Sequence, residues 1–227
     1  MSVAFNGTTS KVENTTATGF DVDTLTVLFR SFARSRGEGN IGRVLSVNEG
    51  ARRPSIFHGV ANVLTIENGH SVQNGRWTFP CTDSMWNYVA IRYDRSSSAN
   101  DPTVRVNRVN VTVTETQTPS GTRDVHTGGY CVGNRTEQSE TWDGKIEHLQ
   151  FFTSILSDAE ADAAIYTPGA YVTNQLLWLP LLTASDLNDY SGGARHGTGT
   201  SVTNGGPVDA VRRQAALNQA VRRAAYF

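Results

Sequence analysis

The acidic residues best suited to acid–base chemistry gather in the polar run between residues 134 and 143. Glu137, Glu140 and Asp143 follow one another at intervals of three residues. Successive side chains of a β-strand point to opposite faces, so this spacing does not place neighbouring carboxylates on one face. A glycosidase needs two carboxylates that flank the same bond. We therefore expect a solvated loop here and no catalytic pair.

A second acidic pair, Asp21 and Asp23, has one residue between its members. On a β-strand, both carboxylates would point to the same face. With a backbone carbonyl they would supply the oxygen ligands that Ca²⁺ prefers, so calcium is the one cofactor that the sequence suggests. We favour the alternative, a pair of solvated charges at the entrance of a strand, with no cofactor and no metal site.

Other enzymatic motifs are absent from the sequence or lie in the wrong context. Residues 37–42 match Gly-x-Gly-x-x-Gly, but the residues after them alternate as a strand does, whereas a dinucleotide site needs a helix there. No Gly-x-Ser-x-Gly or His-Glu-x-x-His motif occurs. The histidines have no ligand spacing, and we expect His148, on a predicted strand, to be half-buried. We predict that the protein is not an enzyme.

Aromatic side chains provide the candidates for sugar binding, because a flat ring matches the apolar face of a pyranose. Trp142, within the polar run, is the first candidate for an exposed platform, and Trp77, beside Arg76, is the second. The alternative for both is burial in the core. Trp86 and Trp178 lie on strand motifs and are expected in the core.

The last residues of the chain, 208–227, form a basic segment rich in helix-forming residues, without Gly or Pro. Its arginines outnumber its single acidic residue, whereas residues 1–207 carry net negative charge. We expect a helical tail that docks on a partner through Arg212, Arg213, Arg222, Arg223, Tyr226 and Phe227. A solvated terminal helix is the alternative, because its apolar stripe is thin.

These side chains belong to a chain of 227 residues with a formal net charge of −1. A chain of this length can bury about 70% of its unfolded surface in one core and needs no disulfides or structural metals to be stable. The near-neutral charge attracts neither nucleic acid nor an anionic membrane, and no apolar run approaches the ~18 residues of a spanning helix. The first residues lack the basic and apolar regions of a signal peptide. For Cys81 and Cys131 we favour buried free thiols over a disulfide.

The apolar residues alternate with a period of two almost throughout, which is typical of an all-β sandwich. The phase of alternation differs between Val104 and Val106 on one side of Asn107-Arg108 and Val109 and Val111 on the other. A two-residue hairpin turn explains this change and would pair Val106 with Val109 and Val104 with Val111.

Two further local patterns predict a turn and a helix. Asn6-Gly7 is typical of a type I′ turn and predicts a hairpin of residues 3–5 against 8–13. Ser157 and Glu160 form the pattern of a capping box ahead of an alanine-rich run, which predicts a short helix over 158–165.

The order of four motifs resembles that of the laminin-G-like, concanavalin A-like jelly-roll domains. The segments that carry this resemblance are Ser2–Thr8, Trp86–Asp94, Gly144–Glu147 and Ile155–Glu160. The resemblance implies a jelly-roll domain over residues 1–207, an antiparallel sandwich of two sheets, followed by the tail of residues 208–227. At the hairpin turn, Arg108 stands where relatives usually have glycine.

A further set of motifs, Trp178–Leu181, Asp189–Gly192 and Gly197-Thr198, resembles family segments that commonly precede the first hairpin. Here these segments follow the predicted helix. Either the last strands close the sandwich beside the first strand of the same chain, or they complete a neighbouring copy. We favour closure within one chain, because loop-closure entropy grows slowly with length.

The resemblance implies two functions. We expect a non-enzymatic virion protein, a capsid decoration or tail-associated protein of a bacteriophage, made in the host cytoplasm and located in the virion. Its partners would be other virion proteins or copies of itself. The alternative is a carbohydrate-binding lectin module whose partners are glycans. Neither function involves nucleic acid or a membrane.

Overall fold

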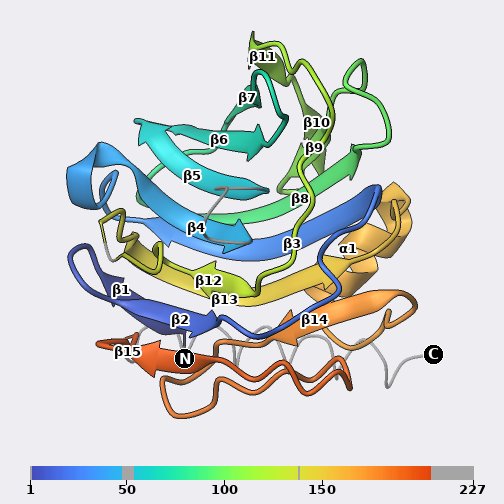
Figure 1. Ribbon diagram of the computed structural model, residues 1–227. Helices are drawn as coiled ribbons and strands as arrows, with labels where there is room; N and C mark the ends of the chain where they lie inside the picture. Colours follow the sequence, from blue (N-terminus) through green and yellow to red (C-terminus); the bar gives the residue numbers. More distant parts are fainter. Residues whose placement is uncertain (1, 48–53, 138, 206–227) are drawn as a thin grey trace.

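The computed structural model of the chain describes residues 2–47, 54–137 and 139–205. In these residues the strands form two antiparallel sheets that enclose one hydrophobic core (Figure 1). The predicted all-β jelly-roll sandwich is confirmed.

One sheet, which we call sheet A, carries the helix on its outer face. Its central strands β3 and β13 pair along most of their length. From edge to edge, sheet A contains β10 (Val109–Val111), β9 (Thr103–Val106), β8 (Trp86–Asp94), β3 (Thr24–Ala33), β13 (Asp143–Phe152), β1 (Val3–Asn6) and β16 (Thr203–Asn204), with β14 (Gln175–Leu179) beside the far end of β13.

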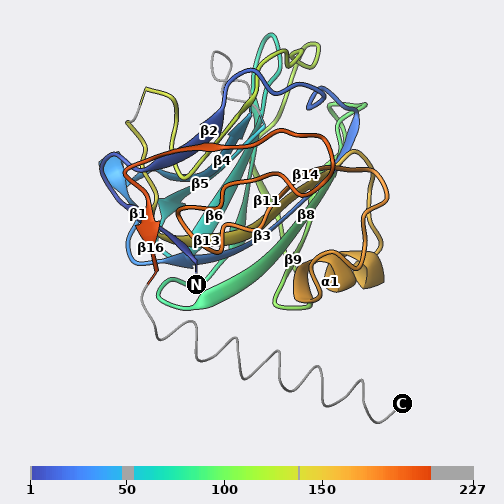
Figure 2. The same ribbon diagram turned by 90° about the horizontal axis from the view of Figure 1, so that it is seen from below.

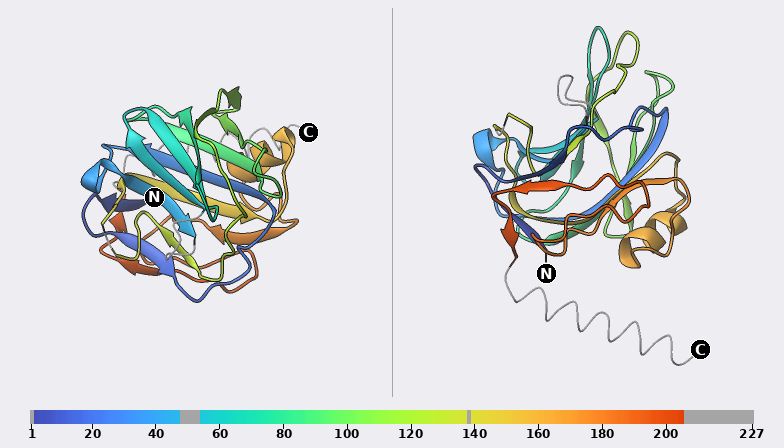
Figure 3. Two further views of the ribbon diagram at one scale, coloured as in Figure 1. Left: turned by 45° about the horizontal axis from the view of Figure 1, so that its top comes forward. Right: turned by 60° about the horizontal axis from the view of Figure 1, so that its bottom comes forward.

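The second sheet, sheet B, lies across the core from sheet A. Its strands β5, β6 and β7 run side by side (Figure 3). From edge to edge, sheet B contains β11 (Thr114–Gln117), β7 (Gly75–Pro80), β6 (Val63–Asn68), β5 (Ser55–Val60), β4 (Gly42–Val47), β12 (Tyr130–Val132), β2 (Lys11–Asn14) and β15 (Thr198–Thr200).

The core takes alternate residues of each strand, as the period of two predicts. On β8, for example, Val89, Ile91 and Tyr93 are buried in the core. The side chains of Tyr88 and Arg92 lie on the opposite face of sheet A. The match to Gly-x-Gly-x-x-Gly forms a short 3-10 turn, η1 (Glu38–Asn40), followed directly by β4. The prediction of a loop at this motif is confirmed.

The predicted helix is α1 (Asp158–Tyr166), and it lies on the face of sheet A that points away from sheet B (Figure 2). Both halves of the capping box form: Glu160 N donates to Ser157 Oγ at 3.3 Å, and Ser157 N donates to Glu160 Oε2 at 2.8 Å. Ala161 and Ile165 pack on the outer face of sheet A.

The last described strands close the sandwich within the chain, as predicted. β16 pairs with β1, β15 pairs with β2, and β14 pairs with β13. Leu177, Leu179 and Leu181, which follow the predicted helix, are buried in the core. Asp189 fastens this segment, because its carboxylate accepts hydrogen bonds from the backbone N–H groups of Trp178 and Arg195.

The hairpin predicted at Asn107-Arg108 forms with the expected register, Val106 opposite Val109 and Val104 opposite Val111. Both turn residues have positive φ, 50° and 70°. A side chain in this conformation costs about 1–2 kcal/mol. The Arg108 guanidinium in turn lies 4.0 Å from the centre of the Tyr166 ring, a contact that offsets part of this cost.

The hairpin predicted at Asn6-Gly7 is wrong. β1 belongs to sheet A and β2 to sheet B, so the loop between them crosses from one sheet to the other. Gly7 has the expected positive φ of 76°. The Asn6 side chain does not form a hairpin turn. Its Oδ1 accepts hydrogen bonds from the backbone N–H groups of Thr8, Thr9 and Ser10, which fixes the crossover.

Candidate ligand-binding face

Trp142 and Trp77, predicted as sugar-binding platforms, are both buried, with 1% and 0% of their surface exposed. Trp77 has the inward parity of β7, and its Nε1 donates to Asp101 Oδ1 at 2.7 Å. Trp142 ends the polar run, and the next residue begins β13, so its ring enters the core. The prediction of exposed platforms is therefore wrong. Trp86 and Trp178, expected in the core, are half-buried.

The acidic pair Asp21 and Asp23 binds an arginine. Arg123 Nη2 lies 3.1 Å from Asp23 Oδ1, and Arg123 Nη1 pairs with Asp21. Burial raises the pKa of Asp21, but the hydrogen bond and charge of Arg123, together with contacts from His126, outweigh this effect, so the pKa lies below its ordinary value. In the described part of the chain, no group of three His, Cys, Asp or Glu side chains is arranged as metal ligands. The two carboxylates therefore form an ion bridge with Arg123.

The carboxylates of the polar run are also paired with arginines. Glu140 lies between Arg43 and Arg135, with Arg135 Nη1 3.1 Å from Glu140 Oε1. Asp143 lies 2.8 Å from Arg34 Nη2. Only 13% of the Glu140 side chain is exposed, so the prediction of a solvated loop is wrong at this residue. Its arginine partner on β4 is distant in sequence, and no local pattern reveals it.

The residues predicted to dock on a partner, Arg212, Arg213, Arg222, Arg223, Tyr226 and Phe227, lie outside the described residues. Their role stays a prediction. Of the histidines, His148 is half-buried on β13, as predicted. No helix in the described part of the chain is long and apolar enough to cross a membrane.

The strongest candidate for a binding site is the outer face of sheet B, which we call the polar face. Two rows of residues cross it, because cross-strand partners share a face. The first row contains Glu13, Cys131, Ser46, Ser55, Glu67, Arg76 and Gln117. The second row contains Arg43, Phe57, Thr65, Thr78 and Thr114. Hydroxyl and charged groups predominate in both rows.

Glu67 is the central carboxylate of the polar face. It is 2% exposed, and its Oε1 accepts hydrogen bonds from Asn74 Nδ2 at 2.8 Å and from Arg76 Nη2 at 3.1 Å. The Arg76 side chain itself is 42% exposed. The buried carboxylate of Glu67 is thus held by Arg76, whose side chain is also accessible from solvent.

Arg43 is the buried cation of the second row. Its Nε donates to Glu140, and its guanidinium carbon lies 5.2 Å from the centre of the Phe57 ring. Burial lowers the pKa of Arg43, and the charge of Glu140 opposes this effect. Phe57 is half-buried, and it is the one aromatic residue of the two rows. The sequence analysis did not single out Phe57, because its place in this row depends on the register of β4, β5 and β6.

Several donors of the polar face are unused. Ser55 Oγ, Arg43 Nη1 and Arg76 Nε are buried and have no hydrogen-bond partner among the described residues. A buried polar group without a partner costs about 1–3 kcal/mol. These three atoms are therefore the polar groups of the face that the described residues leave unsatisfied.

The charges of the polar face and its border balance one another. Lys11 Nζ lies 2.7 Å from Glu13 Oε1, Arg76 pairs with Glu67, and Arg43 pairs with Glu140. Each of these three described cations has a carboxylate partner. The face therefore offers donors and acceptors without a large excess of either charge.

We compared the sequence and the fold with those of known proteins. No protein-family model matches the sequence, and no curated protein matches it. Among solved structures, a "putative carbohydrate binding protein from Bacteroides ovatus" superimposes with a TM-score of 0.61 at 14% identity, over 89% of this chain and 59% of that one. This chain thus spans about three fifths of the length of the Bacteroides protein.

Two further solved structures are similar over part of this chain. A heptameric SAP-like pentraxin from Limulus polyphemus gives a TM-score of 0.53 at 15% identity, over 74% of this chain and 83% of that one. The CBM40 of a Ruminococcus gnavus sialidase gives a TM-score of 0.49 at 17% identity, over 64% of this chain and 83% of that one. At these identities the likeness concerns the fold, a jelly roll of the laminin-G and concanavalin A type.

Proposed function

We propose that this chain is a non-catalytic carbohydrate-binding module and that the polar face of sheet B binds a neutral glycan. The observation that carries the proposal is a set of donors on this face that have no partner among the described residues, Ser55 Oγ, Arg43 Nη1 and Arg76 Nε, next to the acceptor Glu67. Sugar hydroxyl groups both donate and accept, so they match such a mixed surface.

The balance of charges supports a neutral ligand. Because Lys11, Arg76 and Arg43 already have carboxylate partners, an anionic sugar would meet no unpaired cation among the described residues of this face. Phe57 adds an apolar surface beside the polar groups, and a carbon–hydrogen face of a sugar ring packs on such a ring. The likeness to the Bacteroides ovatus structure supports the same class of function through the fold.

The absence of a glycosidase activity is part of this proposal. A glycosidase needs two carboxylates that flank the same bond. The carboxylates Glu140 and Asp143 instead pair with different arginines, Arg43 and Arg34.

The test is a glycan array followed by calorimetry on the strongest neutral glycan. Arg76→Ala and Phe57→Ala should each weaken binding at least about tenfold, a loss typical of central contacts. Arg34→Ala is the matched control, because Arg34 is also half-exposed and paired with a carboxylate but lies outside the polar face. Thermal melts should show all variants folded.

Unchanged binding in both polar-face variants would contradict the location of the site. Failure to bind any glycan, or release of reducing sugar from a bound glycan, would contradict the function itself. The structural role in a virion expected from the sequence stays a prediction. The fold likeness supports the carbohydrate-binding alternative.

A further inference from the structure

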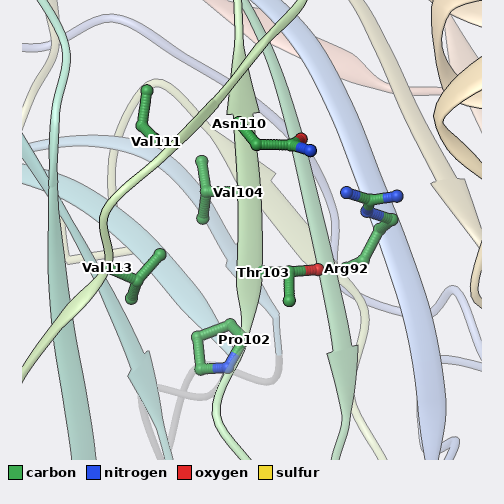
Figure 4. Close-up of a pocket in the computed structure, with 7 residues that line it drawn as sticks. All are labelled: Arg92, Pro102, Thr103, Val104, Asn110, Val111 and Val113. Atoms are coloured by element: carbon green, nitrogen blue, oxygen red, sulfur yellow. The ribbon is translucent and has the colours of Figure 1, made fainter.

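A pocket of about 290 Å³ beside the β9–β10 hairpin does not combine polar and apolar contacts in one site (Figure 4). Its polar side chains lie on the outer face of sheet A, and its valines lie on the core side. The polar residues are Arg92, Thr103 and Asn110, and the valines are Val104, Val111 and Val113. Strand β9 separates the two groups, so one small ligand cannot contact both.

A buried histidine joins three segments of the chain. His58 lies on β5 and is 1% exposed, and the centre of its ring lies 5.8 Å from that of Trp142. Its Nδ1 lies 3.2 Å from the carbonyl oxygen of Ser35, which follows β3. Its Nε2 lies 3.0 Å from Asp83 Oδ1, in the loop between β7 and β8. His58 therefore contacts both of these segments from sheet B.

Both ring nitrogens of His58 face oxygen atoms that accept hydrogen bonds. A carbonyl oxygen and an ionised carboxylate have no proton to donate. A neutral imidazole has a single N–H, so it can donate to one of the two oxygens, and its other nitrogen then faces the second oxygen without a proton between them. The imidazolium carries an N–H on each nitrogen and can donate to both. The positions of the two oxygens therefore favour the protonated ring.

Among the charged groups around His58, Asp83 is the one that contacts its ring. Cys81, in the same loop, stays neutral, because burial and the charge of Asp83 raise the pKa of its thiol to about 12. The charged residues of the other neighbouring segments have partners of their own. Arg36 donates to the Gly59 carbonyl, Arg43 pairs with Glu140, and Asp143 pairs with Arg34.

Asp83 also fastens its loop to the turn between β5 and β6. Its Oδ2 accepts a hydrogen bond from Asn62 N at 3.1 Å, and its own backbone N–H donates to Asn62 Oδ1 at 2.9 Å. Thr82, Ser84 and Met85, on both sides of Asp83, are exposed. Cys81, in contrast, is part of the core. The contacts of Asp83 therefore hold a loop of residues 82–85 that is otherwise surrounded by solvent.

We propose that His58 is a proton-dependent latch for residues 82–85. With a proton on each ring nitrogen, His58 holds the Ser35 carbonyl and the Asp83 carboxylate at once. When the pH rises and the ring loses one proton, one of these contacts is lost and the loop is released. Histidine is the side chain that ordinarily changes its charge between about pH 5 and 8. The latch stabilises the fold at low pH, and this contribution is lost as the pH rises.

The first test is ¹⁵N NMR of the histidine rings in the full chain between about pH 5 and pH 9. Exposed His196 is the internal reference, because its Nδ1 accepts a hydrogen bond from Asp189 N at 3.1 Å and so carries no proton. At the pH at which the His196 ring is neutral, both ring nitrogens of His58 should still carry protons. A single proton on His58 under these conditions would overturn the proposal.

The second test is amide hydrogen exchange at residues 82–85, expressed as protection relative to an unstructured chain. Protection should fall at least about fivefold as His58 loses its proton, as expected for the loss of one hydrogen bond. Asp83→Asn should lower protection at every pH and remove the pH dependence. Asp186→Asn is the matched control, because this carboxylate is also partly buried but binds Asn188 and Tyr190 within its own loop. Protection that stays constant while His58 loses its proton would overturn the latch and leave the proposed function unaffected.

Discussion

Removal of the closing strands should abolish cooperative folding. A chain that ends at residue 170 lacks β14, β15 and β16 and loses Leu177, Leu179 and Leu181, which are at most 1% exposed. Truncation of one buried leucine to alanine costs about 2–5 kcal/mol. Loss of all three therefore costs at least about 6–15 kcal/mol, which equals the usual stability of a whole domain, about 5–15 kcal/mol.

The assay is thermal and urea unfolding followed by circular dichroism. The matched control is a chain that ends at residue 207, which removes only the segment predicted as a basic tail and should keep its melting temperature. Leu179→Ala should lower the free energy of unfolding by about 2–5 kcal/mol, and Leu176→Ala, at a partly buried site, by less. A single sharp transition with an unchanged midpoint in the chain that ends at residue 170 would refute the reasoning.

Three further predictions concern single side chains. Trp142→Ala should lower the free energy of unfolding by about 3–5 kcal/mol without changing glycan affinity per folded molecule, and an affinity loss at unchanged stability would restore the platform hypothesis. Burial raises the pKa of the Cys81 thiol to about 12, so a thiol reagent at about pH 8 should label neither Cys81 nor Cys131 until urea is added; rapid labelling of the native protein would contradict this. Hydrogen bonds from Arg92 and Asn110 hold the pKa of Asp158 below its ordinary value of 3.8, so its contacts stabilise the fold above that value and are lost as the pH falls through the lowered pKa. The stability gap between the protein and Asp158→Asn should therefore shrink below about pH 4, and a gap that stays constant would count against the ion pair.

The features that sequence predicted correctly depend on neighbouring residues. The turn at Asn107-Arg108 follows from a change of phase within a few residues, and the capping box of Ser157 and Glu160 spans one helical turn. Closure by the segment after the helix also holds, because its leucines need a sheet to cover. For the turn and the capping box, the local pattern and the fold require the same conformation; closure is a long-range feature that the buried leucines require.

The errors occur where the structure depends on distant partners. Asn6-Gly7 forms a tight turn, but the sheet that each flanking strand joins is decided by strands more than a hundred residues away. Polar neighbours predicted that Trp142 is exposed, whereas its place at the start of β13 turns it inward. The polar face could not be predicted, because its rows become visible only when the register across sheet B is known.

The pairing of the first two strands also determines when the protein can finish folding during its synthesis. β1 pairs only with β13 and β16 among the described strands, and β2 pairs only with β12 and β15. A ribosome adds about 5–20 residues per second, so the roughly 200 residues between Val3 and its partner Asn204 take about 10–40 s to make. Throughout that time the N-terminal strands have unpaired edges, which are open to pairing with other chains. High expression should therefore favour aggregates seeded by the N-terminal segment, and slower translation or bound chaperones should raise the yield of folded protein.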